Sequence, residues 1–153
     1  RLAPQFPALY LVLVGTGPLD AMLRLQVQQL GLAQRVLFAG FQQHVELLMP
    51  AFDLHLLLSK NEGFGIATIE AMACGVPAVG TDVPGTHDIL HDSEGGMLLP
   101  LEDEEAACAA VAQLLLDAPR RARMGQLARA ETVQRYSLPR LERQLRQFYA
   151  GLV

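Results

Sequence analysis

The chain alternates short apolar runs with longer stretches in which apolar residues recur every three or four positions. Short apolar runs bounded by glycine or proline are typical of strands. They predict strands at Leu9–Val14, Val36–Ala39, Asp53–Leu58, Pro77–Gly80 and Gly96–Leu99. The run Asp53–Leu58 is apolar along nearly its whole length, which is typical of a strand that is buried on both faces.

Stretches with helical spacing separate and follow these runs, and proline or glycine marks many of their ends. This spacing predicts helices at Leu19–Leu30 and His44–Met49, from about Gly65 to Cys74, and at Glu102–Leu116, Pro119–Arg135 and Pro139–Leu152. Strands that alternate with helices indicate a mostly parallel sheet covered by helices on both faces. The expected fold is therefore a Rossmann-like, three-layer α/β domain.

Ligands of such sheets bind outside the carboxyl ends of the strands. Two loops of this chain follow predicted strands directly, namely Gly15–Pro18 and Ser59–Gly65. These two loops are therefore the first places to look for a functional site.

Composition and charge narrow the class of protein. A chain of 153 residues with 51% hydrophobic and 18% charged residues is expected to form one globular domain. Its net charge of −4 argues against nucleic acid as the main partner. Arginines gather in the C-terminal stretch, either on solvated helix faces or for contact with an acidic membrane surface or another domain. Cys74 and Cys108 have no metal-type spacing and are expected to be buried free thiols.

The segment from Ser59 to Pro77 carries the clearest chemistry. A helix is expected to begin near Gly65, and no Ser, Thr, Asp or Asn immediately precedes it, so its first N–H groups lack a strong side-chain cap. Exposed amides at a helix start attract anions, and phosphate is the usual guest. Gly63 and Gly65 would let the backbone approach such a ligand closely.

Two glutamates flank this expected anion site. Glu70 lies roughly 7 Å along the helix, about where the ribose of a bound nucleoside diphosphate would lie. Glu62 precedes the helix and would avoid the diphosphate, because like charges repel, so it is expected to face neutral sugar hydroxyls. The plain alternative is that Glu62 is an exposed loop acid and Glu70 a surface acid on an amphipathic helix.

The segment resembles the donor-binding signature of the retaining glycosyltransferases of family 4. Seven residues separate Glu62 from Glu70, with Gly63-Phe64-Gly65 after the first and Ala71-Met72-Ala73-Cys74-Gly75-Val76-Pro77 after the second. The resemblance continues through Val12–Pro18, Val36–Gly40, Gly85–Leu90, Gly95–Pro100 and Tyr136-Ser137. Two departures are Leu58, where proline is frequent, and Asp88, where glutamate is usual.

The resemblance implies a role for each matching residue. Glu70 would hold the ribose, and Glu62, the expected catalytic residue, would contact the transferred sugar. The remaining donor-binding residues would be Gly15, Gly17, Gly63, Phe64, Gly65 and Ile66, with the amides of Phe64, Gly65 and Ile66 on the diphosphate. The backbone of Gly40, Phe41 and Gln42 would lie beside the base. Lys60 does not match the family's phosphate-binding lysine and is interpreted as a solvated loop lysine.

The histidines carry weaker expectations. His55 is expected to be a satisfied core residue, and His44 and His91 are expected at helix edges or in loops. His87 lies in the stretch Gly85–Asp88, interpreted as a loop at the carboxyl ends of the strands, where it could line the site.

The resemblance also implies a domain organisation. Residues 1–153 would be a single donor-binding domain, the C-terminal half of a GT-B fold, without the N-terminal acceptor domain and without its own first strand. That strand is expected between Leu9–Val14 and Asp53–Leu58, whose edges would otherwise be unpaired. Another strand or another copy of the chain would then have to fill the gap.

Three hypotheses of function follow. The first is a retaining hexosyltransferase of cell-surface glycan or glycolipid synthesis, inactive as this segment alone, with a nucleotide-sugar donor and a sugar or lipid-linked acceptor. The second is a GT-B sugar-nucleotide epimerase or phosphorylase, and the third is a non-catalytic nucleotide-binding module. No cofactor, metal or nucleic acid is expected. The expected location is the cytoplasm, with contact at the inner face of the membrane left open.

Overall fold

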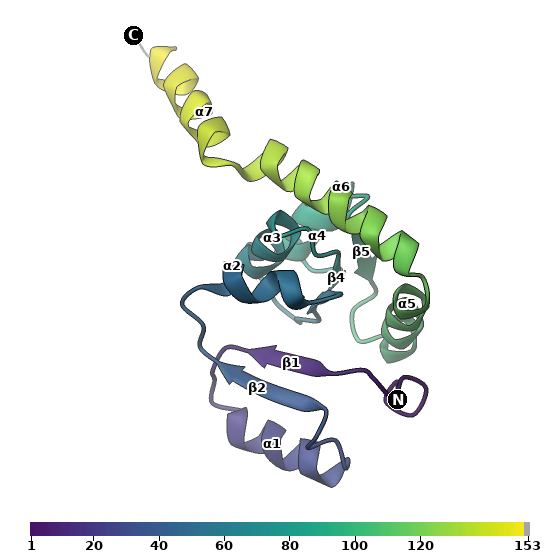
Figure 1. Cartoon of the computed structure of the whole chain (residues 1–153). Coiled ribbons are helices and arrows are strands. Elements are labelled where there is room, and N and C mark those ends of the chain that lie inside the picture. The colour runs from purple at the N-terminus through teal and green to yellow at the C-terminus, as the bar shows by residue number, and fades with distance from the viewer. Residues whose placement is uncertain (152–153) are drawn as a thin grey trace. The chain divides into compact units, whose positions relative to one another are not determined.

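The computed structural model of the chain describes residues 1–151 (Figure 1). They divide into two compact units, the first comprising Arg1–Val45 and the second beginning at Glu46. Each unit is described by itself below. No helix among residues 1–151 combines the length and the apolar character that crossing a membrane requires.

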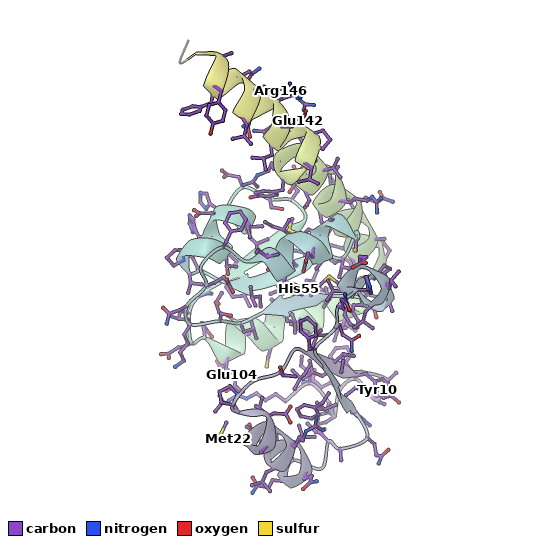
Figure 2. All side chains as sticks on the ribbon, turned by 90° about the vertical axis from the view of Figure 1, so that its left-hand side faces the viewer. Tyr10, Met22, His55, Glu104, Glu142 and Arg146 are labelled. Carbon is purple, nitrogen blue, oxygen red and sulfur yellow. The ribbon has the colours of Figure 1, made fainter. Side chains whose placement is uncertain are left out.

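The first unit is a parallel strand pair with one helix. β1 (Leu11–Val14) pairs with β2 (Val36–Gly40), and α1 (Asp20–Gln29) connects them. Within the described residues β1 pairs only with β2, so its other edge has no strand partner. None of residues 1–45 is buried, and large side chains such as Tyr10 and Met22 are exposed (Figure 2). This unit therefore has no core of its own.

The second unit is built on a parallel sheet in the order β3-β4-β5, formed by His55–Leu57, Ala78–Thr81 and Gly96–Leu99. The short helices α2 (Val45–Leu48) and η1 (Met49–Ala51) precede the sheet. Helix α3 (Ile66–Ala73) connects β3 to β4, and α4 (Pro84–Leu90) connects β4 to β5. The chain continues through α5 (Glu104–Leu116), α6 (Ala118–Tyr136) and α7 (Leu138–Ala150).

The core lies on both faces of the central strand β4, which is buried at all its residues. Successive side chains of a strand point to opposite faces. Ala78 accordingly packs in one cluster with Met72, Ile89, Leu90 and Ala128. Val79 packs in another with Leu99, Ala110, Leu114 and Met124. Helices therefore cover both faces of the sheet, which confirms the three-layer prediction for this unit.

The predicted elements are present, with ends that match the structure or differ from it by one or two residues. The prediction for β3 was wrong in one respect: the strand is shorter and is not buried on both faces, since Leu56 is 36% exposed at the sheet edge. Leu152, the predicted end of the last helix, lies outside the described residues. Cys74 and Cys108 are free thiols but half-buried rather than buried.

The interpretation of Gly85–Asp88 as a loop was also wrong, because these residues lie in α4. Val83 is extended, and Pro84 occupies the first turn of the helix, where its missing N–H costs nothing. Proline followed by glycine looks like a turn in the sequence, yet here it begins a helix.

We expect Leu114→Ala to lower the free energy of unfolding by about 2–5 kcal/mol, because Leu114 is 0% exposed and its loss leaves a cavity. The matched control is Leu116→Ala in the same helix, where the leucine is 77% exposed. Urea unfolding of the purified proteins measures both. Equal losses in the two variants would contradict the placement of the core.

Candidate donor-binding site

The loop between β3 and α3 begins at the carboxyl end of the sheet and is tied there by two side chains. The Thr81 hydroxyl, at the end of β4, donates a hydrogen bond to the carbonyl of Ser59 at 2.5 Å. Lys60 Nζ lies 2.5 Å from Glu102 Oε1. This exposed ion pair raises the pKa of Lys60 and lowers that of Glu102 through the hydrogen bond and the charges. Lys60 is exposed, as expected of a solvated loop lysine, and it also pairs with Glu102.

Gly65 turns the loop into the helix. Its φ is 81°, in the left-handed region that glycine adopts without strain, and it occupies the N-cap position of α3. Its carbonyl accepts from the amides of Thr68 and Ile69, while no acceptor among residues 1–151 pairs with the amides of Ile66 and Ala67. The helix start therefore offers two open amides, as expected of an anion site.

The carboxylate of Glu62 lies on this turn, contrary to expectation. Its Oε1 accepts from the amide of Gly65 at 3.0 Å and from that of Phe64 at 3.3 Å. Two of the three amides expected on a diphosphate thus bind the protein's own acid, and Glu62 does not point away. The physical reason is that a nearby carboxylate satisfies the same amides that attract an external anion.

Glu70 lies on α3, four residues after its first residue and about 6 Å along the helix axis. It is exposed, its carbonyl accepts from the amide of Cys74, and no hydrogen bond or ion pair joins its carboxylate to another of residues 1–151. Its carboxylate is thus available to accept hydrogen bonds from a ligand, as the ribose-binding prediction requires.

Other elements support the loop from behind. The amide of Gly85, in the first turn of α4, donates to the carbonyl of Glu62 at 3.3 Å. The exposed ring of Phe64 meets Tyr136, at the end of α6, edge to face with centroids 6.2 Å apart. Neither Gly85 nor Tyr136 was expected to contact the loop, because sequence spacing does not indicate which distant segments meet.

His87 lies on α4 and is held by its neighbours. Its Nδ1 lies 2.6 Å from Asp82 Oδ1, and its ring stacks on that of His91 at 4.5 Å. In the same helix, the carbonyl of Asp88 accepts a hydrogen bond from Arg135 at 2.8 Å.

His55 fits the expectation of a satisfied interior residue (Figure 2). Its Nε2 lies 3.2 Å from Thr68 Oγ1, in the first turn of α3. Burial lowers the pKa of His55 from 6.5 to about 4, because desolvation disfavours the charged imidazolium. The ring is therefore neutral at physiological pH.

Two further expected donor residues, Gly15 and Gly17, belong to the first unit. Gly15 has a φ of 113°, Gly40 a φ of 65°, and the amide of Gly15 donates to the carbonyl of Gly40 at 2.7 Å. A side chain at Gly15 or Gly17 would meet no atom within 4 Å, so this loop has open space beside it.

A strand–loop–helix turn with open amides at the carboxyl end of a parallel sheet is typical of α/β domains that bind phosphate-bearing ligands. Within that class, the chain belongs to the group 1 glycosyl transferases, whose sequence model matches residues 1–131. This confirms the glycosyltransferase membership that the two glutamates and their flanks imply.

The chain is also similar to individual proteins of known name. It is 36% identical over 139 residues to the N-acetyl-alpha-D-glucosaminyl L-malate synthase of Bacillus anthracis, covering 91% of this chain and 36% of that protein. Anabaena Alr3699/HepE in complex with UDP superposes with a TM-score of 0.87 at 26% identity, covering 95% of this chain and 42% of that chain. Its complex with UDP-glucose gives 0.85 at 28% identity, with the same coverage of both chains. This chain therefore spans well under half the length of these relatives.

We expect the pH dependence of stability to report His55. Because its pKa is about 4 in the folded protein and near 6.5 when unfolded, the unfolded state binds the proton between these values. The free energy of unfolding should rise from pH 4 to 6.5 with a contribution of at most about 1.4 kcal/mol per pH unit. His55→Gln should remove this contribution in urea unfolding at several pH values. An unchanged slope would contradict a buried neutral His55.

Proposed function

We propose that the full-length protein is a glycosyltransferase that moves a sugar from a nucleoside diphosphate sugar to an acceptor hydroxyl. The observation that carries this proposal is the turn at Gly65, where the open amides of Ile66 and Ala67 lie between Glu62 and Glu70 in the chain. Family membership supplies the reaction class. The named relatives give no reason to prefer an epimerase or a phosphorylase.

The donor is proposed to lie across the start of α3. The open amides of Ile66 and Ala67 would bind the diphosphate, and those of Phe64 and Gly65 would join them once Glu62 leaves. Gly63 would allow close backbone approach, and Glu70 would hold the ribose hydroxyls. A donor role for Gly15 and Gly17, in the first unit, is proposed from the family resemblance alone. The UDP and UDP-glucose complexes of the Anabaena relative support a nucleotide-sugar as the ligand class.

Glu62 is proposed to work in two positions. Its carboxylate caps the amides of Phe64 and Gly65, and an arriving diphosphate competes for them with more negative charge. Once displaced, the side chain would turn to the transferred sugar. The capped position keeps the loop in its binding shape, because the amides already converge on one anionic oxygen.

Departure of the nucleoside diphosphate is the step that this site would assist. Negative charge grows on the leaving diphosphate as the sugar–oxygen bond breaks, and preorganised amides stabilise that charge without reorganising. Retention of configuration is proposed from the family resemblance alone. The leaving diphosphate would help to deprotonate the acceptor, and no metal or other cofactor is assigned a role.

Acceptor binding is proposed to reside outside residues 1–153. The relatives are more than twice as long as the matched segment, and β1 and β3 each leave one edge without a strand partner among the described residues. These observations support a further strand and an acceptor-binding domain, without which the segment would be inactive. Glycan or lipid-linked acceptors, a cytoplasmic location and peripheral membrane contact belong to the same proposal.

We expect Glu70→Ala in the full-length protein to weaken nucleoside diphosphate binding by about 1.5–3 kcal/mol, the contribution of a hydrogen bond to a charged group. Calorimetric titration with UDP, GDP and ADP measures the effect. Glu105→Ala, which removes another exposed helix glutamate, is the control and should bind normally. An unchanged dissociation constant for Glu70→Ala would remove Glu70 from the site.

We expect Glu62→Ala to separate binding from transfer. The substitution removes the internal carboxylate from two amides, so affinity for the bare nucleoside diphosphate should be kept or increased. Sugar transfer should fall by roughly tenfold or more, because a charge-assisted contact to the sugar is lost. Glu62→Gln, which keeps a neutral acceptor near the amides, should bind more weakly than Glu62→Ala. Equal losses of binding and transfer would contradict the two-position role.

A further inference from the structure

The first turn of α4 lies in close contact with the backbone of the loop that carries Glu62. A Cβ atom added to Gly85 would lie 2.7 Å from the amide nitrogen of Phe64, 2.8 Å from the carbonyl oxygen of Glu62 and 2.8 Å from the carbonyl carbon of Gly63. Real Cβ atoms essentially never approach other atoms this closely. The loop and the helix therefore touch through their backbones, with no room for any side chain at this position.

Gly85 is required for space rather than for backbone conformation. Its φ does not lie in the left-handed region, in contrast to that of Gly65 at 81°. All three nearest atoms belong to backbone, so no change of side-chain rotamer could relieve the contact. A substitution at Gly85 must move either α4 or the loop.

Helix α4 is the less mobile of the two partners. Ile89 and Thr86 are both 0% exposed in the core. At the other end of the helix, Arg135 from α6 donates to the carbonyl of Ile89 at 3.1 Å and to that of Asp88 at 2.8 Å. The loop, by contrast, is largely exposed at Gly63 and Phe64. The loop should therefore yield first.

We infer that Gly85 is a positioning residue for the diphosphate-binding amides, because the absence of its side chain sets how far the loop stands from α4. This inference rests on the proposed function of the loop. Phe64 supplies the amide nearest to Gly85, and that amide already binds the Glu62 carboxylate. In enzymes, a misplacement of oriented groups by about 1 Å can lower the reaction rate by about a hundredfold.

The test compares Gly85→Ala with Gly96→Ala in the full-length protein. At Gly96 an added Cβ would meet mainly the far end of the Leu90 side chain, at 2.5 Å, away from the loop. For each variant, titration of the best-bound nucleoside diphosphate among UDP, GDP and ADP, and of the corresponding nucleoside by competition, gives two dissociation constants. The nucleoside constant divided by the nucleoside diphosphate constant isolates the contribution of the diphosphate. Circular dichroism gives the melting temperature.

We expect Gly85→Ala to weaken the nucleoside diphosphate roughly tenfold or more and the nucleoside by less than twofold. Gly96→Ala should lower the melting temperature and leave the ratio of the two dissociation constants as in the wild type. Arg135→Gln, which releases the end of α4, should also lower the ratio of the two dissociation constants, by a few-fold. If Gly85→Ala does not fold, Arg135→Gln tests the inference in its place.

The outcomes separate this inference from the function it rests on. A wild-type protein that binds no nucleoside diphosphate overturns both. A wild-type protein that binds one, together with unchanged ratios in Gly85→Ala and Arg135→Gln, overturns the role of Gly85 alone. Parallel loss of nucleoside and nucleoside diphosphate affinity would also overturn it, because that pattern belongs to a general structural defect.

Discussion

The structure depends on how the chain passes from β3 into α3 through one glycine in the left-handed region. At this turn the amides of Phe64 and Gly65 bind the Glu62 carboxylate, and the next two amides, of Ile66 and Ala67, are open. The first amides of a helix have no acceptor within the helix, and leaving them unpaired costs free energy. The same requirement that makes the turn bind its own acid also makes it ready for a diphosphate.

The fold could largely be predicted from the sequence where local and global preferences agree. Strands β4 and β5 were found within one residue because a buried central strand is apolar throughout and glycine or proline bounds it. Prediction failed where position in the sheet decides the outcome. The apolar run at β3 suggested burial on both faces, yet a strand at the edge of its sheet leaves part of that run exposed.

The candidate site shows the same division. The spacing of Glu62 and Glu70 and the glycines between them are local, so the sequence indicated the turn and its amides. The sequence did not indicate that Glu62 occupies two of those amides, because the attraction of its carboxylate to an uncapped helix start opposes its repulsion from a ligand. The backbone contact of Gly85 depends on two segments more than twenty residues apart in sequence, which no spacing pattern encodes.

Helix α6 contributes to both hydrophobic clusters, through Ala128 in one and Met124 in the other. The two clusters are expected to unfold together, because loss of α6 would remove packing contacts from both. The second unit should accordingly unfold as one cooperative block. Residues 1–45, which bury none of their side chains, lie outside that block and have no comparable source of cooperativity.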